Sequence, residues 1–110
     1  SPEVLMGDVE GRPRLALRLR ADGMALLEIS DRGAQVRTMV GVLEDGLAWV
    51  GLLDPQQRFR AGLGVRHDGC PRLELYDDRG GTRASLRLRD DGRPGFELTD
   101  ADGKSVYAAP

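Results

Sequence analysis

Few side chains in this chain could perform catalysis, and the sequence does not bring them together. His67 is the only histidine and Cys70 the only cysteine. A histidine can act as a general base, and a cysteine can act as a nucleophile or a zinc ligand. Two residues do not complete a tetrahedral zinc site, and no recognisable triad sets a nucleophile against His67. We therefore expect no catalytic residue, no metal ion, no cofactor and no enzymatic activity.

Acidic residues gather in short segments that contain glycine, a pattern that calcium sites and tight turns share. One such segment is Asp100-Ala101-Asp102-Gly103. Carboxylate oxygens suit calcium, but this string lacks the glutamate that closes an EF-hand loop. Aspartate and glycine are also the residues that a tight turn requires. We favour structural turns, with calcium binding as the alternative.

The aspartates recur with a fixed spacing of 23 residues, at Asp8, Asp31, Asp54, Asp77 and Asp100. Asp-Gly pairs recur with the same spacing, starting at Asp22, Asp45, Asp68 and Asp91. A constant period of this length indicates copies of one structural unit packed side by side. We expect a single repeat domain over residues 1–110, cut from a longer protein, with units 1–23, 24–46, 47–69, 70–92 and a partial unit 93–110.

Each unit predicts a β-hairpin. In the fourth unit, Leu73 and Leu75 alternate with polar residues, and so do Leu86 and Leu88 after a turn that contains Gly80. Alternation with a period of two is typical of strands with one buried face. We expect an all-β fold of about ten strands whose alternate aliphatic residues form one continuous apolar face.

The strands could form an antiparallel meander or a parallel solenoid. In a solenoid, the equivalent arginines would lie ~4.8 Å apart and repel one another; they are Arg14, Arg37, Arg60 and Arg83. A meander places another strand between them, so we favour the meander and keep the solenoid as the alternative. The apolar face must then be covered by rolling into a barrel, by folding into a sandwich or by pairing with another copy. Of these we favour a rolled, barrel-like sheet.

The predicted outer face departs from the repeat in the second and third units. Hairpin register places Trp49 between Gly41 and Gly64. The tryptophan could simply cover these glycines, or it could bind a protein partner or a second copy of the chain. The candidate interaction patch comprises Leu26, Met39, Trp49, Leu53 and Tyr76.

Composition excludes several classes of partner. The net charge is −2, with 16 basic and 18 acidic residues mixed along the chain, which argues against a nucleic-acid footprint. No run approaches the ~18 apolar residues of a membrane-spanning helix, so we expect no membrane insertion. We expect a non-enzymatic structural or protein-interaction module, self-associating through the patch around Trp49. The alternative is a barrel that binds a small apolar ligand in its interior.

Residues 68–86, which include Pro71-Arg72-Leu73-Glu74-Leu75 and Arg83-Ala84-Ser85-Leu86, carry a family resemblance. This unit resembles a tandem repeat found in uncharacterised bacterial proteins, a resemblance that implies no known activity. The period and the hairpin design are also similar to those of MORN repeats. The Tyr-x-Gly strings that mark MORN repeats do not occur here, so no role is transferred from that family.

Overall fold

The computed structural model describes residues 2–109 and shows an all-β fold of ten strands, with no helix in that range. In chain order the strands are β1 (Glu3–Gly7), β2 (Pro13–Leu19), β3 (Ala25–Ser30), β4 (Val36–Val42), β5 (Ala48–Leu53), β6 (Phe59–Val65), β7 (Pro71–Tyr76), β8 (Thr82–Leu88), β9 (Pro94–Thr99) and β10 (Ser105–Ala109). Each predicted unit contributes one hairpin; only the outermost residue at each end lies outside the described range.

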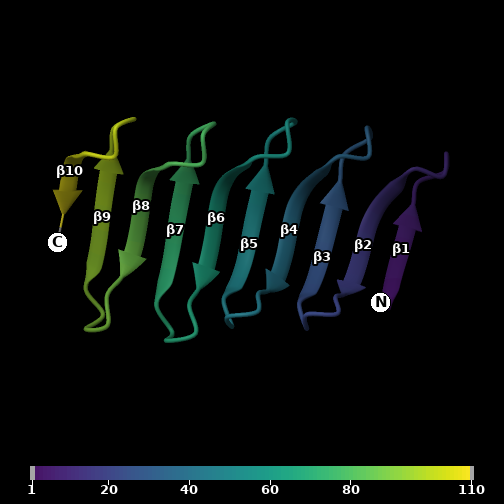
Figure 1. Ribbon diagram of the computed structural model, residues 1–110, viewed down its shortest axis with the longest axis horizontal. Coiled ribbons are helices and arrows are strands. Elements are labelled where there is room, and N and C mark those ends of the chain that lie inside the picture. Colours follow the sequence, from purple (N-terminus) through teal and green to yellow (C-terminus); the bar gives the residue numbers. More distant parts are fainter. Residues whose placement is uncertain (1, 110) are drawn as a thin grey trace.

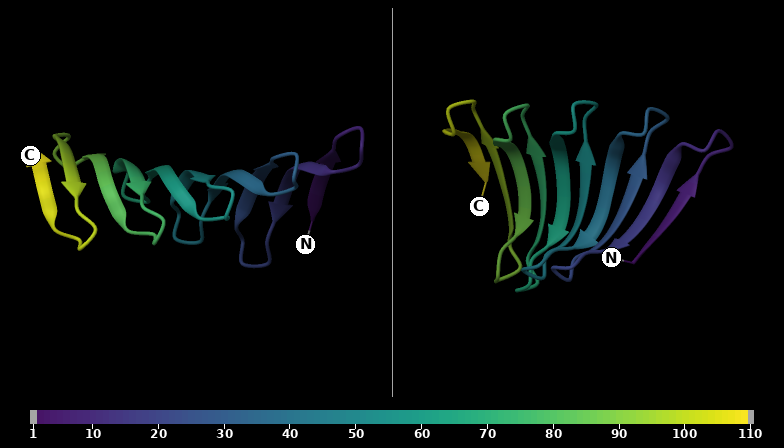
Figure 2. Two further views of the ribbon diagram at one scale, coloured as in Figure 1. Left: turned by 90° about the horizontal axis from the view of Figure 1, so that it is seen from above. Right: turned by 45° about the vertical axis from the view of Figure 1, so that its right-hand side comes forward.

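The strands form one sheet in which every strand is hydrogen-bonded to its neighbours in the sequence. All nine pairings are antiparallel, so the predicted meander is confirmed and the parallel solenoid is wrong. Figure 1 shows the strands side by side, with β1 and β10 at opposite ends of the sheet. Figure 2 shows that the sheet is a single twisted layer.

Aspartate turns join the two strands of each hairpin, as the turn after β7 illustrates. The Asp77 Oδ1 atom accepts hydrogen bonds from the amides of Arg79 and Gly81, at 3.0 and 2.9 Å. Gly80 has a φ of 84°, in the left-handed region that glycine adopts without strain. The equivalent positions in the second and third units are Ala34 and Gln57, which also have positive φ. The predicted Asx turns are therefore confirmed, and they hold even where glycine is absent.

The sheet stays open, and the expectation of a rolled, barrel-like sheet is wrong. Leu17 of β2 pairs with Leu27 of β3, which pairs with Val40 of β4, 23 residues after Leu17. The chain thus returns to the same height after each unit, and no stagger accumulates between strands. A closed barrel requires tilted strands and a fixed stagger. Residues 2–109 therefore enclose no barrel interior for an apolar ligand.

The two sides of the sheet differ in composition. One side, which we call the apolar face, presents three rows of uncharged side chains across the strands. Its middle row is Val4, Leu17, Leu27, Val40, Val50, Leu63, Leu73, Leu86, Phe96 and Ala109. The other side, which we call the glycine face, carries Gly41, Gly51, Gly62, Gly64 and Gly95 within its strands.

Burial is the reverse of what the alternation predicts. Leu63 on the apolar face keeps 53% of its surface exposed, whereas Leu26 and Leu53 on the glycine face keep 7% and 8%. The physical reason is that a single-layer sheet has no second layer to cover its aliphatic rows. Across residues 2–109 there is also no helix long and apolar enough to cross a membrane.

Candidate interaction surfaces

Trp49 lies on the glycine face, at the centre of the sheet. It pairs with Gly41 on β4 and with Gly64 on β6, the neighbours expected from the register. A Cβ atom added at Gly62 would lie 2.8 Å from the indole Nε1 atom, and one added at Gly51 would collide with the six-membered ring. The indole therefore lies directly on the backbone of these glycines and packs on them.

Phe59 completes this packing. Its ring meets the Trp49 ring edge to face, with the centroids 4.9 Å apart and the planes at 68°. This is a favoured geometry for two aromatic rings. Trp49 is half-buried as a result, although no second layer covers the sheet.

Two of the five predicted patch residues, Leu26 and Leu53, are buried within the sheet. Leu26 is buried beside Gly41, where an added Cβ atom would lie 2.7 Å from Leu26 Cδ2. Leu53 is equally buried. Met39, Trp49 and Tyr76 are half-buried, so the surface that this patch offers to a partner is smaller than the sequence suggests.

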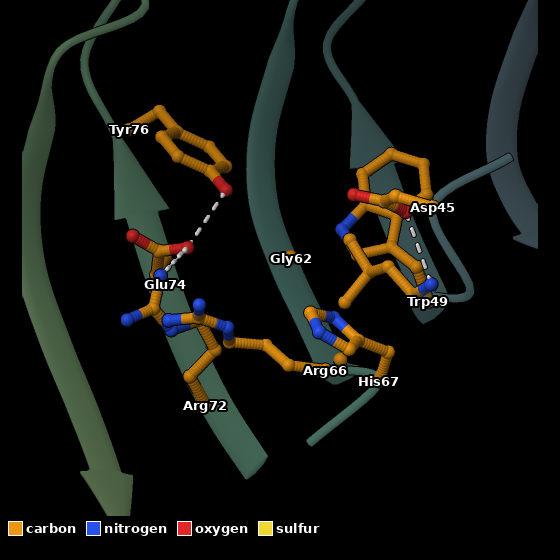
Figure 3. Close-up of a pocket in the computed structure, with 10 residues that line it drawn as sticks. Asp45, Trp49, Gly62, Arg66, His67, Arg72, Glu74 and Tyr76 are labelled. Carbon is orange, nitrogen blue, oxygen red and sulfur yellow. Dashed lines mark hydrogen bonds and ion pairs between the residues drawn. The ribbon is translucent and has the colours of Figure 1, made fainter. Parts of the chain in front are cut away.

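A groove of about 320 Å³ lies between Trp49 and Tyr76, above Gly62 (Figure 3). The Tyr76 hydroxyl donates a hydrogen bond of 3.4 Å to Glu74. Burial, followed by the charge of Glu74, raises the pKa of Tyr76, so its hydroxyl remains a donor at neutral pH. Charged groups of both signs line the rest of the groove together with His67: Asp45, Arg66, Arg72 and Glu74. The groove therefore selects for neither a cationic nor an anionic ligand.

The repeating arginines on the glycine face tie each hairpin to the next unit. In each case the arginine Nε atom donates to the carbonyl oxygen 16 residues further along, from Arg14 to Ser30, Arg37 to Leu53, Arg60 to Tyr76 and Arg83 to Thr99. The guanidinium groups of three of them also lie 3.6 or 3.7 Å from the aspartate of their own turn. The repeating arginines therefore have a structural role. Arg60 contacts Tyr76 by donating a hydrogen bond to the backbone carbonyl of Tyr76.

His67 and Cys70 lie near one another in sequence but have different surroundings. His67 lines the groove beside Trp49. The thiol of Cys70 instead donates a hydrogen bond of 3.0 Å to Asp90 Oδ1 in the neighbouring turn. This bond, together with burial and the charge of Asp68, raises the pKa of Cys70 to about 11. A protonated thiol is a poor nucleophile and a poor metal ligand.

The acidic turns are accounted for by their own backbone. The amides of Gly81 and Arg79 lower the pKa of Asp77, because their hydrogen bonds favour the charged carboxylate. Asp77 Oδ2 also lies 3.7 Å from the guanidinium group of Arg83. The aspartate that opens the turn in each of the other four units likewise accepts two backbone amides through its Oδ1 atom. Turn formation is therefore sufficient to explain why these aspartates recur.

The apolar face gathers most of the exposed large hydrophobic side chains of residues 2–109 on one side of the sheet. The sheet measures 49 Å along its length and 28 Å across. Most of the large side chains along the face keep between 36% and 59% of their surface exposed, whereas Leu15, Leu27 and Val50 are half-buried. The alternation in the sequence predicts this set of residues but predicts that they are buried. The sequence feature that argues against closure is the constant period of 23 residues. Because the chain returns to the same height on the sheet after each unit, the strands lack the stagger that a closed barrel requires.

Comparison of the chain with protein-family models and with curated proteins finds no match. The structure supports a regular series of antiparallel hairpins. The particular repeat type suggested by residues 68–86 has no support from these comparisons.

Proposed function

We propose that the chain is a non-enzymatic structural module that acts by contact with other protein surfaces, and that the apolar face is its contact surface. The observation that carries this proposal is an exposed, charge-free face on a sheet of 49 by 28 Å. A face of these dimensions presents on the order of 1,000 Å², above the ~300–600 Å² of the largest apolar patch on a typical monomer. Contiguous apolar surfaces of this size mark interaction sites.

The groove beside Trp49 is the weaker candidate for this contact. Leu26 and Leu53 are buried, and the indole already packs on the glycines and on Phe59. What remains accessible there belongs to half-buried side chains. We assign Trp49 the structural role of covering the glycine floor, and we assign partner binding to the opposite face.

The proposal that the chain is not an enzyme concerns His67 and Cys70, the two side chains best suited to catalysis. The Cys70 thiol donates its hydrogen bond to Asp90, and this bond and burial raise the pKa of Cys70 to about 11. A catalytic thiol must be activated by a base, whereas these surroundings favour the protonated form of Cys70.

The test combines sedimentation with the fluorescence of anilinonaphthalene sulfonate, a dye that binds exposed apolar surface. The apolar face is either free, in which case the dye binds, or covered, in which case the mass exceeds that of one chain. Replacing Leu63 and Leu73 together by threonine keeps strand propensity while removing apolar surface. We expect this double variant to reduce dye binding or assembly at least twofold. A matched Arg87→Thr change on the glycine face should change neither.

Circular dichroism on all three proteins checks that the sheet is intact. A wild-type chain that is monomeric and also fails to bind the dye would remove the basis of the proposal, because the apolar face would then be neither free nor paired.

A further inference from the structure

We infer that the partner of the apolar face is a second copy of this chain, packed face to face as a two-layer sandwich. This inference rests on the proposed function and names the partner. It follows from three properties of the face: its charge, its relief and its area.

The absence of charge makes the face compatible with itself. In a two-fold symmetric pair, each residue approaches the same patch on the other copy. A lysine or glutamate on the face would then be buried against uncharged residues in both copies, without a counter-ion and at a high cost in desolvation. The three rows of the apolar face contain no charged residue, so symmetry imposes no such cost.

The relief of the face alternates from strand to strand. In the row next to the aspartate turns, the large residues of the strands from β3 to β9 lie on odd-numbered strands, at Ile29, Leu52, Leu75 and Leu98. The strands at the two ends of the sheet do not follow this pattern, because the row also holds Met6 on β1, Leu15 on β2 and Tyr107 on β10. In β4, β6 and β8 the same row holds smaller residues, Thr38, Ala61 and Ala84.

The row next to the Asp-Gly turns has the opposite phase. Its large residues lie on even-numbered strands, at Leu19, Val42, Val65 and Leu88. Its odd-numbered strands carry Ala25, Ala48, Pro71 and Pro94. Over the central part of the face, the two outer rows therefore alternate with opposite phase, on either side of a middle row of large side chains.

This pattern is complementary to itself. A two-fold axis along the length of the sheet places each strand on its own copy and exchanges the two outer rows, so Leu52 faces Ala48. A two-fold axis parallel to the strands, centred between β5 and β6, places odd strands on even ones, so Leu52 faces Ala61. In both arrangements, large side chains of the two outer rows on the central strands face small ones, as in the interdigitation of packed sheets, while the middle rows place aliphatic residues against aliphatic residues.

The area is also sufficient for a stable pair. With the sheet at 49 by 28 Å, two such faces together would bury on the order of 2,000 Å². Obligate homodimers bury about this much or more, and they are the more apolar class of interface. Because both copies have the same twist, their faces can remain in contact along the sheet.

The experiment measures the mass and the thermal stability of the protein as a function of its concentration. We expect the wild type to sediment as a dimer at micromolar concentration and its Tm to rise with concentration, because dimerisation favours the folded chain. Leu63→Lys places one charge in the middle row of the apolar face and should weaken the dimer at least 100-fold. The matched variant Ser85→Lys places the same charge in β8 on the glycine face, where Ser85 pairs with Glu74 and Glu97, and should dimerise like the wild type.

If Leu63→Lys does not fold, judged by circular dichroism, the milder Leu63→Thr should still weaken the dimer by about tenfold. A wild-type chain that stays monomeric but binds the apolar dye would overturn self-pairing and leave the proposed contact function in place, with a different protein or a lipid as the occupant. A monomer that does not bind the dye would overturn both. Dimers of equal strength in the wild type and in both Leu63 variants would also overturn the inference.

Discussion

The two faces of this sheet are built from the same ten strands but differ in how far their large side chains are buried. The apolar face keeps the alternating pattern in every unit, and most of its large side chains remain exposed. The glycine face breaks the repeat in the second and third units, and it holds Leu26 and Leu53, the two most buried leucines. Regular repetition therefore leaves aliphatic rows exposed on a single layer, whereas local departures from the repeat allow packing within that layer.

The contrast also locates the stability of an isolated chain. On the glycine face, Leu26 and Trp49 can lie flat because the neighbouring glycines have no side chain. Gly41, Gly51, Gly62 and Gly64 provide the space beneath Leu26 and Trp49. On the apolar face the middle row holds aliphatic side chains that stand upright next to one another, so each covers its neighbours only in part.

The largest effect that would test this contrast is expected for Gly51→Val. The new side chain would collide with the Trp49 ring, and we expect a loss of about 3 kcal/mol in the free energy of unfolding, since overpacking a close contact is costly. Ala48→Val adds the same side chain to the same strand on the apolar face, where we expect a change within about 0.5 kcal/mol. Urea denaturation of both variants measures the difference. Equal losses would show that the two faces are packed alike.

A smaller effect is expected for Trp49→Ala. Removing a half-buried indole that covers glycine backbone should lower the free energy of unfolding by about 2 kcal/mol, less than for a fully buried aromatic residue. Leu52→Ala, on the apolar face of the same strand, should cost about 0.5–1 kcal/mol, because Leu52 is already 48% exposed. These values apply at concentrations where the chain is monomeric.

Sedimentation of Trp49→Ala decides between the two roles of this tryptophan. The structural role predicts lower stability with unchanged self-association. Unchanged stability with weaker assembly would instead restore the patch around Trp49 as the contact surface.

The smallest effect concerns the arginines that hold the glycine face together. Arg60→Lys removes the planar group that reaches both the Tyr76 carbonyl, at 2.9 Å, and Asp54, at 3.6 Å. We expect a loss of about 0.5–1 kcal/mol, in the range of one exposed hydrogen bond. Arg32→Lys, in an exposed turn, serves as the control and should have no measurable effect. Thermal denaturation of the two variants makes the comparison, and equal melting temperatures would mean that Arg60 does not link the units.

Much of the fold could be predicted because register in a hairpin is a local property. The positions of the turns determine which residues face each other, so Trp49 was correctly placed between Gly41 and Gly64. The hydrogen bond from Cys70 to Asp90 could not be predicted in this way, because it joins two turns through side-chain rotamers. The carbonyl partner of Arg60 was missed for the same reason.

The sequence by itself determined the strands, their antiparallel order and the division of residues between the two faces, because alternation and turn chemistry act over a few neighbouring residues. Only the tertiary structure decided which face is buried. Burial depends on whether the sheet closes, and closure depends on stagger summed over all ten strands. With no stagger to sum, the sheet remains open, and its aliphatic rows are left for another surface to cover.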